Sequence, residues 1–191
     1  MKFIKLFEEY EGMLQTSPDI DRMTPEELEG AFKYECYKTN PNVDLVKQII
    51  DHPDFSYFLN SELSGRHSTP LMLASIGNHP EIVQHLLGTE GITINTRNKD
   101  GYTALSDACR NGCVEIVEIF LARPDIKVNL QDKGGWTPLM WACLKNQPEI
   151  VGMLLQHPDT DISITTKDGA TAWFNAKPEI REMFPQLEVV S

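Results

Sequence analysis

Two identical tripeptides in this chain combine residue types that serve in acid-base chemistry. They are His52-Pro53-Asp54 and His157-Pro158-Asp159. Histidine changes its charge near neutral pH, and histidine and aspartate side chains are common general acids and bases. A catalytic role centred on the His157-Pro158-Asp159 turn is therefore one hypothesis for this protein.

The same tripeptide resembles the one through which J-domain co-chaperones stimulate their chaperone partner, so a chaperone-linked role is the companion hypothesis. A structural interpretation competes with both, because each tripeptide follows a predicted helix and its proline stops that helix from continuing. The two tripeptides also occupy matching places in an internal repeat, and the long flanking helices of a J-domain are missing. We therefore favour a turn at both places.

Three cysteines raise the question of a metal site: Cys109, Cys113 and Cys143. Cys109 and Cys143 stand 34 residues apart beside a repeated alanine, where a small packing residue is expected. Equivalent backbones of stacked repeats also lie too far apart for a disulfide. The sequence holds no Ser, His and Asp set in the context of an activated nucleophile and no glycine-rich phosphate loop. We expect no metal, no cofactor and no enzymatic activity.

Charge and composition narrow the class of partner. The 191 residues carry a formal net charge of −11, with a pI near 4.8, which disfavours capture of nucleic acid or of anionic membranes. No stretch approaches the roughly 20 apolar residues of a membrane span. Lys5 interrupts the short apolar start, so the pattern of a signal peptide is missing, and four cysteines then indicate reduced thiols. We expect a monomer in the cytoplasm or nucleus that binds neither nucleic acid nor membrane.

An internal repeat positions these candidate residues. Related segments begin at a constant spacing of 34 residues, at Thr69 (TPLMLAS), Thr103 (TALSDAC), Thr137 (TPLMWAC) and Thr171 (TAWFNAK). An alanine follows each threonine by five residues, and Glu-Ile-Val recurs in the same phase from residues 81, 115 and 149. So many positions in phase indicate a repeat protein.

Each unit is predicted to form two helices and an extended tip. Thr-Pro suits a first helical turn, because threonine caps the helix and proline gives up a donor that has no partner there. Nine residues after the threonine stand Asn78, Gly112 and Asn146, which tolerate positive φ between two helices. The second helix carries a buried apolar stripe, as in residues 150–155. One unit cannot bury its own stripe, so neighbouring units must stack.

The segments DGYTALSDACRNGCVEIVEIFL and GGWTPLMWACLKNQPEIVGMLL resemble ankyrin repeats, and the resemblance covers roughly residues 60–184. It implies an all-α solenoid of helix-turn-helix units with hairpin-like tips, about five units including caps. The family's histidine after Thr-Pro-Leu is replaced by Met72, Ser106, Met140 and Phe174, so its hydrogen bonds must be made otherwise. The period is 34 where about 33 is typical, with the extra residue after the second helix.

The ends of the repeat array are degenerate, and we read the chain as one continuous domain. We assign residues 1–21 to an extra N-terminal helix, 22–60 to an N-terminal capping repeat, 61–95, 96–129 and 130–163 to repeats, and 164–191 to a C-terminal capping repeat. The extra helix is predicted to dock through Phe3, Ile4, Phe7 and Leu14. In the N-terminal cap, Thr24 and the glutamate three residues later have the spacing of a capping box, which predicts a helix to about Lys38.

Trp136 and Trp141 are the leading candidates for a binding surface. The resemblance places Trp136 on a tip that projects toward the concave face, and Tyr102 takes the same place one repeat earlier. Large exposed aromatic residues on neighbouring tips are typical of interaction hot spots. Trp141 shares its register position with Asp107, so we expect that position to be partly open. The alternative is that both indoles pack on neighbouring repeats, whereas Trp173 takes a leucine place and is expected in the core.

The same register predicts a protein-binding strip on the tips and at the exposed ends of the first helices. Its tip residues are Arg66, Ser68, Lys99, Asp100, Tyr102, Lys133 and Trp136, and its helix residues are Ile76, Asp107, Arg110, Trp141, Leu144 and Lys145. The strip is aromatic and locally basic on an acidic protein. It would suit a partner segment with apolar anchors and some acids.

The resemblance also implies a modification. Some ankyrin repeats are substrates of an asparaginyl hydroxylase that favours an asparagine with a leucine eight residues before it, and Asn95 and Asn129 fit that spacing. The acid usually found two residues before the asparagine is missing. The alternative is that these side chains hydrogen-bond the loop backbone.

The sequence therefore favours a non-enzymatic protein-protein interaction module or adaptor that binds a partner protein through the concave face of the repeats. Two alternatives stay open: the chaperone-linked or catalytic role centred on the His157-Pro158-Asp159 turn, and the targeting subunit of an enzyme complex.

Overall fold

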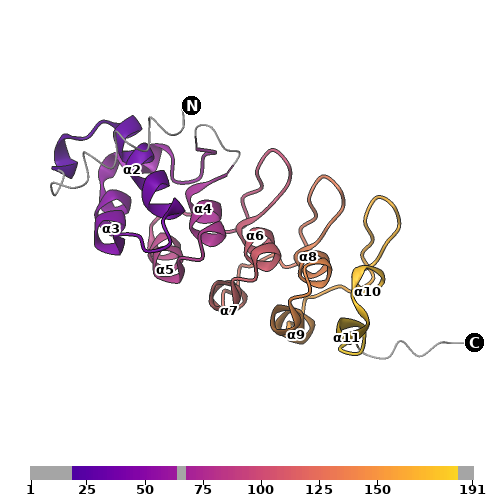
Figure 1. Cartoon of the computed structure of the whole chain (residues 1–191). Helices are drawn as coiled ribbons and strands as arrows, with labels where there is room; N and C mark the ends of the chain where they lie inside the picture. The colour runs from indigo at the N-terminus through magenta and orange to yellow at the C-terminus, as the bar shows by residue number, and fades with distance from the viewer. Residues whose placement is uncertain (1–18, 64–67, 185–191) are drawn as a thin grey trace, which may run out of the picture. The chain divides into compact units, whose positions relative to one another are not determined.

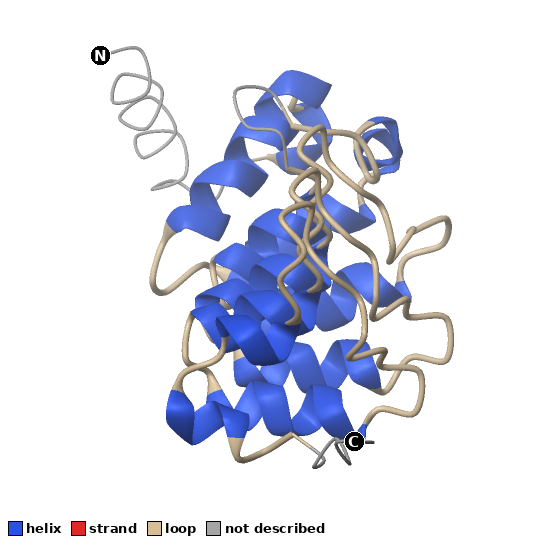
Figure 2. Cartoon of the chain, turned by 90° about the vertical axis from the view of Figure 1, so that its right-hand side faces the viewer, coloured by secondary structure: helices blue, strands red, loops and turns tan. Residues whose placement is uncertain are grey.

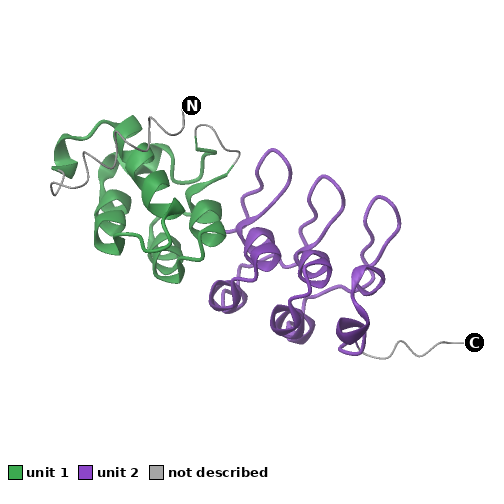
Figure 3. Ribbon diagram, in the orientation of Figure 1, with its two compact units in different colours: residues 1–93 green, residues 94–191 purple. Residues whose placement is uncertain are grey.

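A computed structural model describes residues 19–63 and 68–184 of the chain (Figure 1). All regular secondary structure in these two ranges is helical, with no strand, which confirms the expected all-α fold (Figure 2). None of the described helices is long and apolar enough to cross a membrane. The chain divides into two compact units, residues 1–93 and 94–191 (Figure 3). The predicted extra helix, with Phe3, Ile4, Phe7 and Leu14, lies outside the described residues.

The first unit holds two helix pairs and two short 3-10 turns. Its elements are η1 (Ile20–Arg22), α2 (Pro25–Tyr37), α3 (Val43–Asp51), η2 (Pro53–Tyr57), α4 (Pro70–Ile76) and α5 (Pro80–Gly88). Helix α2 packs against α3, η2 and α4, and α3 packs against α5. The capping box that starts α2 is confirmed, because the Thr24 hydroxyl accepts from the Glu27 N–H and the Glu27 carboxylate accepts from the Thr24 N–H at 2.8 Å.

The second unit repeats one arrangement three times. Its helices are α6 (Ala104–Asn111), α7 (Val114–Leu121), α8 (Pro138–Leu144), α9 (Pro148–Gln156), α10 (Ala172–Asn175) and α11 (Pro178–Arg181). Helix α8 packs between α6 and α10, while α7 packs against α9 in a second layer, and a long loop rises before each first helix (Figure 1). Two pairs in the first unit and three in the second make the five helical repeats that the period predicts, although their boundaries stay a prediction.

A threonine caps each first helix, and at three of the four histidine places the side chain of Met72, Ser106 or Met140 completes the cap. Phe174 makes no such bond, and α10 is capped by Thr171 alone. Ser106 makes two hydrogen bonds in that role: its hydroxyl accepts from the Thr103 N–H at 2.9 Å and donates to the Thr103 carbonyl at 2.8 Å. Where methionine stands, the Met140 Sδ accepts from the Thr137 N–H at 3.4 Å. Within these three repeats, a bond to the threonine N–H inside the first helical turn therefore replaces that of the missing histidine.

The predicted turns between paired helices are confirmed. Asn78, Gly112 and Asn146 have φ of 57°, 76° and 57°, in the left-handed region. On α9 the buried stripe is narrower than predicted: Ile150, Val151 and Leu154 are buried, whereas Leu155 is half-buried.

The tips of the second unit are joined to one another through their backbones. The Lys133 N–H donates to the Asp100 carbonyl at 2.9 Å, and the Lys167 N–H donates to the Gly134 carbonyl at 3.0 Å, one repeat further on. Gly135 has a φ of 85° and touches the next tip, while Gly169 has nearly the same φ but nothing near its side-chain position. Consecutive tips are therefore held at a fixed separation.

Trp173 corrects one expectation, because its side chain is 44% exposed instead of buried. The leucines at the same register position, Leu105 and Leu139, are buried, and a further helix pair of the second unit follows each of them. No helix pair follows α10 and α11 in the described part of the chain, so the indole lacks that cover. The Arg181 guanidinium lies over the Trp173 ring instead, 4.6 Å from its centroid.

Gly135 and Gly169 form a matched pair for testing the contact between tips. A Cβ on Gly135 would lie 2.8 Å from the Lys167 nitrogen, whereas a Cβ on Gly169 would meet nothing within 4 Å. We expect Gly169→Ala to lower the free energy of unfolding by about 1 kcal/mol, the cost of a positive φ. Gly135→Ala should cost about 1–3 kcal/mol more, because backbone atoms must also shift. Urea unfolding measures both, and equal losses would contradict a tight contact between tips.

Candidate functional site

Three aromatic side chains meet on the second unit, and we call Tyr102, Trp136 and Trp141 the aromatic cluster. The ring centroids of Trp136 and Trp141 lie 5.0 Å apart, and those of Tyr102 and Trp141 lie 5.8 Å apart, with tilted planes. All three side chains are half-buried. Two come from consecutive tips and one from α8, so the repeat spacing brings together residues that are up to 39 positions apart.

Asp132 holds the backbone of Trp136 and the indole of Trp141 in place. One carboxylate oxygen accepts from the Gly134 and Trp136 N–H groups at 2.8 and 3.0 Å, and the other accepts from the Trp141 Nε1–H at 3.0 Å. Sequence reasoning missed this buried residue. The repeat register could have indicated it, because Asn98 stands 34 residues earlier. The Asn98 side chain accepts from the Tyr102 N–H at 2.9 Å, as Asp132 does from the Trp136 N–H.

Arg110 covers one side of the aromatic cluster with positive charge. Its guanidinium carbon lies 5.5 Å from the Tyr102 centroid and 5.5 Å from the Trp141 centroid. A guanidinium at this distance over aromatic rings is held by the cation–π interaction. The structure therefore brings Arg110, which the sequence predicted for the strip, into contact with the aromatic cluster.

Asp107 corrects the expectation that its register position is open. The residue is only 5% exposed, and burial raises the pKa of its carboxyl to about 7, with Arg110 opposing the increase. This short side chain ends among Arg110, Tyr102 and Cys113, with all of which it interacts electrostatically. The longer Trp141 indole at the matching position reaches far enough out to stay half-exposed.

The remaining predicted strip residues differ in exposure. Lys99, Asp100, Lys133, Leu144 and Lys145 are exposed on the second unit, and Ile76 is half-buried on the first. Ser68 is buried, which corrects its expected place on an exposed tip: its carbonyl accepts from the Leu63 N–H at 2.9 Å, directly before α4. Arg66 lies outside the described residues.

Asn95 and Asn129 hydrogen-bond the loop of the following repeat. The Asn95 amide donates to the Asp125 carbonyl at 2.7 Å, and its oxygen accepts from the Lys127 N–H at 2.9 Å. Asn129 makes the same pair of bonds, to the Asp159 carbonyl and from the Asp161 N–H. These contacts match the structural alternative, and hydroxylation stays a prediction. Asn60, which the sequence analysis did not single out, clamps residues 91 and 93 in the same way.

The two His-Pro-Asp tripeptides form the same local turn. The Nδ1 atoms of His52 and His157 accept from the N–H of the aspartate two residues on, at 3.2 and 3.3 Å. This geometry is the turn that the sequence analysis favoured over a reactive pair.

The cysteines have the surroundings of packing residues. All four are buried and none is in a disulfide, and burial raises the pKa of Cys113 to about 11 and that of Cys143 to about 12. Among the described residues, no group of three or more His, Cys, Asp or Glu side chains is placed to hold a metal ion.

Comparison with known proteins gives a family match. The family described as ankyrin repeats (3 copies) matches residues 34–132 and again residues 71–168. No curated protein matches the chain.

The buried Asp107 carboxyl predicts a specific pH dependence of stability. Its pKa is about 7 in the folded chain but about 4 when unfolded, so between these values the unfolded chain loses the proton first. The free energy of unfolding of the wild type should therefore fall, relative to that of Asp107→Asn, as the pH rises from 4 to 7. We expect the variant to be more stable by on the order of 3 kcal/mol at pH 8, and by under about 1 kcal/mol at pH 4.5. Urea unfolding at several pH values measures the difference, and a constant difference would contradict the raised pKa.

The loop clamp predicts a cost for removing an asparagine side chain. Asn95→Ala deletes two hydrogen bonds to the next loop and leaves backbone groups without their partner, so we expect a loss of about 2 kcal/mol of unfolding free energy. Asn40→Ala, at an exposed loop position, serves as the control and should change stability by less than about 0.5 kcal/mol. Chemical denaturation compares the two, and similar small effects would show that the clamp contributes little.

Proposed function

Because this chain belongs to the ankyrin-repeat family, whose repeats are generally protein-protein interaction modules, we propose that it is a non-enzymatic adaptor that binds a partner protein through the aromatic cluster and Arg110. The observation that carries the proposal is the half-buried group of Tyr102, Trp136 and Trp141 on the tips and first helices. Tryptophan, tyrosine and arginine are the residue types that dominate binding energy at protein interfaces.

The aromatic cluster is held in one arrangement before any partner arrives. Asp132 fixes the Trp136 backbone and the Trp141 indole nitrogen, and the tips that carry the rings are hydrogen-bonded to one another. A surface that is already ordered loses less side-chain entropy on binding. The aromatic cluster would therefore bind by presenting the edges and faces of its rings to a partner in an arrangement that is already fixed.

The charges around the aromatic cluster indicate the chemistry of the partner. Arg110 lies on the rings, and the exposed Lys99, Lys133 and Lys145 belong to the same strip of tips and helix ends. Lys133 is 4.0 Å from the Asp100 carboxylate, both side chains being well exposed. Such a surface suits a partner segment that carries an apolar or aromatic anchor beside carboxylates.

A targeting subunit of an enzyme complex is a special case of the same proposal, with the activity in the partner. The catalytic or chaperone-linked alternative has less support, since the Nδ1 atom of His157 is already engaged with the Asp159 backbone in a turn. We place the protein in the cytoplasm or nucleus, where its four cysteine thiols would stay reduced, and expect it to act as a monomer.

Replacing Trp136 tests the proposal. Trp136→Ala should weaken partner binding by about 2 kcal/mol or more, because it removes a central aromatic anchor. Trp173→Ala is the matched control, since it deletes an indole that is at least as exposed but does not belong to the aromatic cluster. The measurement is a quantitative pull-down from cytosolic extract, with the wild type and the two variants as baits. Urea unfolding first checks that all three baits unfold with equal cooperativity.

Proteins retained by the wild type and by Trp173→Ala, but lost with Trp136→Ala, would be the expected result. Equal retention by all three baits would mean that the aromatic cluster is structural and would overturn the proposed site.

A further inference from the structure

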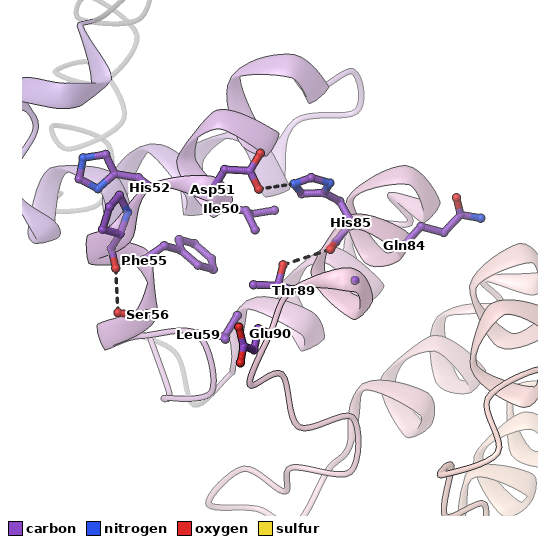
Figure 4. A pocket seen from close by; sticks show the side chains of 12 residues that line it. Ile50, Asp51, His52, Phe55, Ser56, Leu59, Gln84, His85, Thr89 and Glu90 are labelled. Carbon is purple, nitrogen blue, oxygen red and sulfur yellow. Dashed lines mark hydrogen bonds and ion pairs between the residues drawn. The ribbon is translucent and has the colours of Figure 1, made fainter.

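A groove in the first unit lies between α3 with η2 on one side and α5 on the other (Figure 4). Its volume is about 630 Å³, and the side chains of Ile50, Phe55 and Leu59 form an apolar floor. All three are buried in the core of the unit. The aromatic cluster has no part in this groove.

The rim of the groove is acidic. Asp51 lies on one side of the hollow and Glu90 on the other, and none of the residues that line it is a lysine or an arginine (Figure 4). The Asp51 Oδ1 meets the His85 Nε2 at 2.8 Å, yet the Asp51 side chain stays 65% exposed. The rim therefore presents carboxylate charge around an apolar floor, with imidazoles as its basic groups.

A second hollow extends this surface. It has a volume of about 440 Å³ and shares Asp51, His52 and Pro53 with the groove, so the two adjoin at the first His-Pro-Asp turn. Asp19 and Asp21 line this second hollow. Asp19 also pairs with Arg22 at 3.4 Å, but both side chains are highly exposed and such a pair is weak. Acidic groups thus continue beyond the groove.

We propose that this groove binds a basic peptide segment of a partner protein. An arginine or lysine combines an apolar stem, which fits the floor of Ile50, Phe55 and Leu59, with a charged head that carboxylates at the rim can receive. A second cation two residues along an extended peptide would lie about 7 Å away, within reach of the second hollow. The acidic rim repels phosphate groups, so a peptide is favoured over nucleic acid as the occupant.

The groove is a different surface from the aromatic cluster, and it would bind a partner segment of the opposite charge. The two proposals can therefore be tested independently of each other. A partner with acidic and apolar anchors would take the cluster, and a basic segment would take the groove. A single partner could carry both segments at different places in its chain.

The test is a titration of the full ¹⁵N-labelled chain, followed by two-dimensional NMR, with the peptide acetyl-Arg-Leu-Arg-Leu-amide. The control peptide replaces both arginines by citrulline, which keeps the shape and the stem but removes the charge. We expect saturable amide shifts at residues such as Gln84, Gly88 and Thr89 with the arginine peptide, and affinity at least about 5-fold weaker for the citrulline peptide.

Matched variants locate the site. Asp51→Asn with Glu90→Gln should weaken arginine-peptide binding at least about 5-fold, whereas Glu118→Gln, an exposed acid on α7 in the second unit, should leave it unchanged. Trp136→Ala should also leave it unchanged, which separates this test from that of the aromatic cluster. If the double variant proves unstable in urea unfolding, Glu90→Gln alone still provides the comparison.

Several results would overturn the proposal: no saturable shifts in the groove, equal binding of the two peptides, or equal binding by wild type and the acid-deleted variant. Groove shifts that grow with protein concentration alone would assign the surface to a second copy of the chain. Groove shifts caused by Lys2→Gln with Lys5→Gln, without peptide, would assign it to the chain's own N-terminal segment.

Discussion

Hydrogen bonds between consecutive loops are the constraint on which the second unit depends. Asn95 and Asn129 each satisfy a carbonyl and an N–H of the following loop, and the tips are joined by backbone bonds one repeat apart. These polar groups would be costly to leave unpaired, so each loop has one place relative to the next. The helices attached to the loops are then in register, and their apolar stripes meet. The fold is thus governed by a polar framework along its edge as well as by its core.

The aromatic cluster follows from that framework. Tyr102 and Trp136 occupy equivalent tips, and the fixed separation of the tips leaves room for Trp141 of α8 within contact of both rings. Asp132 then ties the later tip to α8 through one carboxylate. The buried Asp107 destabilises this region, because burial disfavours its ionised form and raises the pKa of its carboxyl to about 7. Burial of this acid beside the aromatic cluster lowers stability at neutral pH.

The repeat period made most of the fold predictable, since four threonines in phase determine helix starts, turns and tips together. Errors arose where one position has different surroundings in different repeats. Trp173 was expected in the core because it takes a leucine place of the repeat, but no helix pair follows it in the described chain. Asp107 was expected to be open because it is charged, yet its short side chain ends below its larger neighbours. Asp132 and the groove were missed because they depend on which side chains meet in space.

The exposure of Trp173 marks the repeat of the second unit that is enclosed least by its neighbours. Helices α10 and α11 have four residues each and contact a neighbouring repeat on one side only, within the part of the chain that the structure describes. In a linear array, cooperativity passes from neighbour to neighbour, so a repeat with a single interface frays at a lower free energy than one enclosed on both sides. Amide protons of α10 should then exchange through local unfolding, while those of α8 exchange only when larger parts of the unit open. Within the described part of the second unit, we therefore expect opening to begin at α10 and α11.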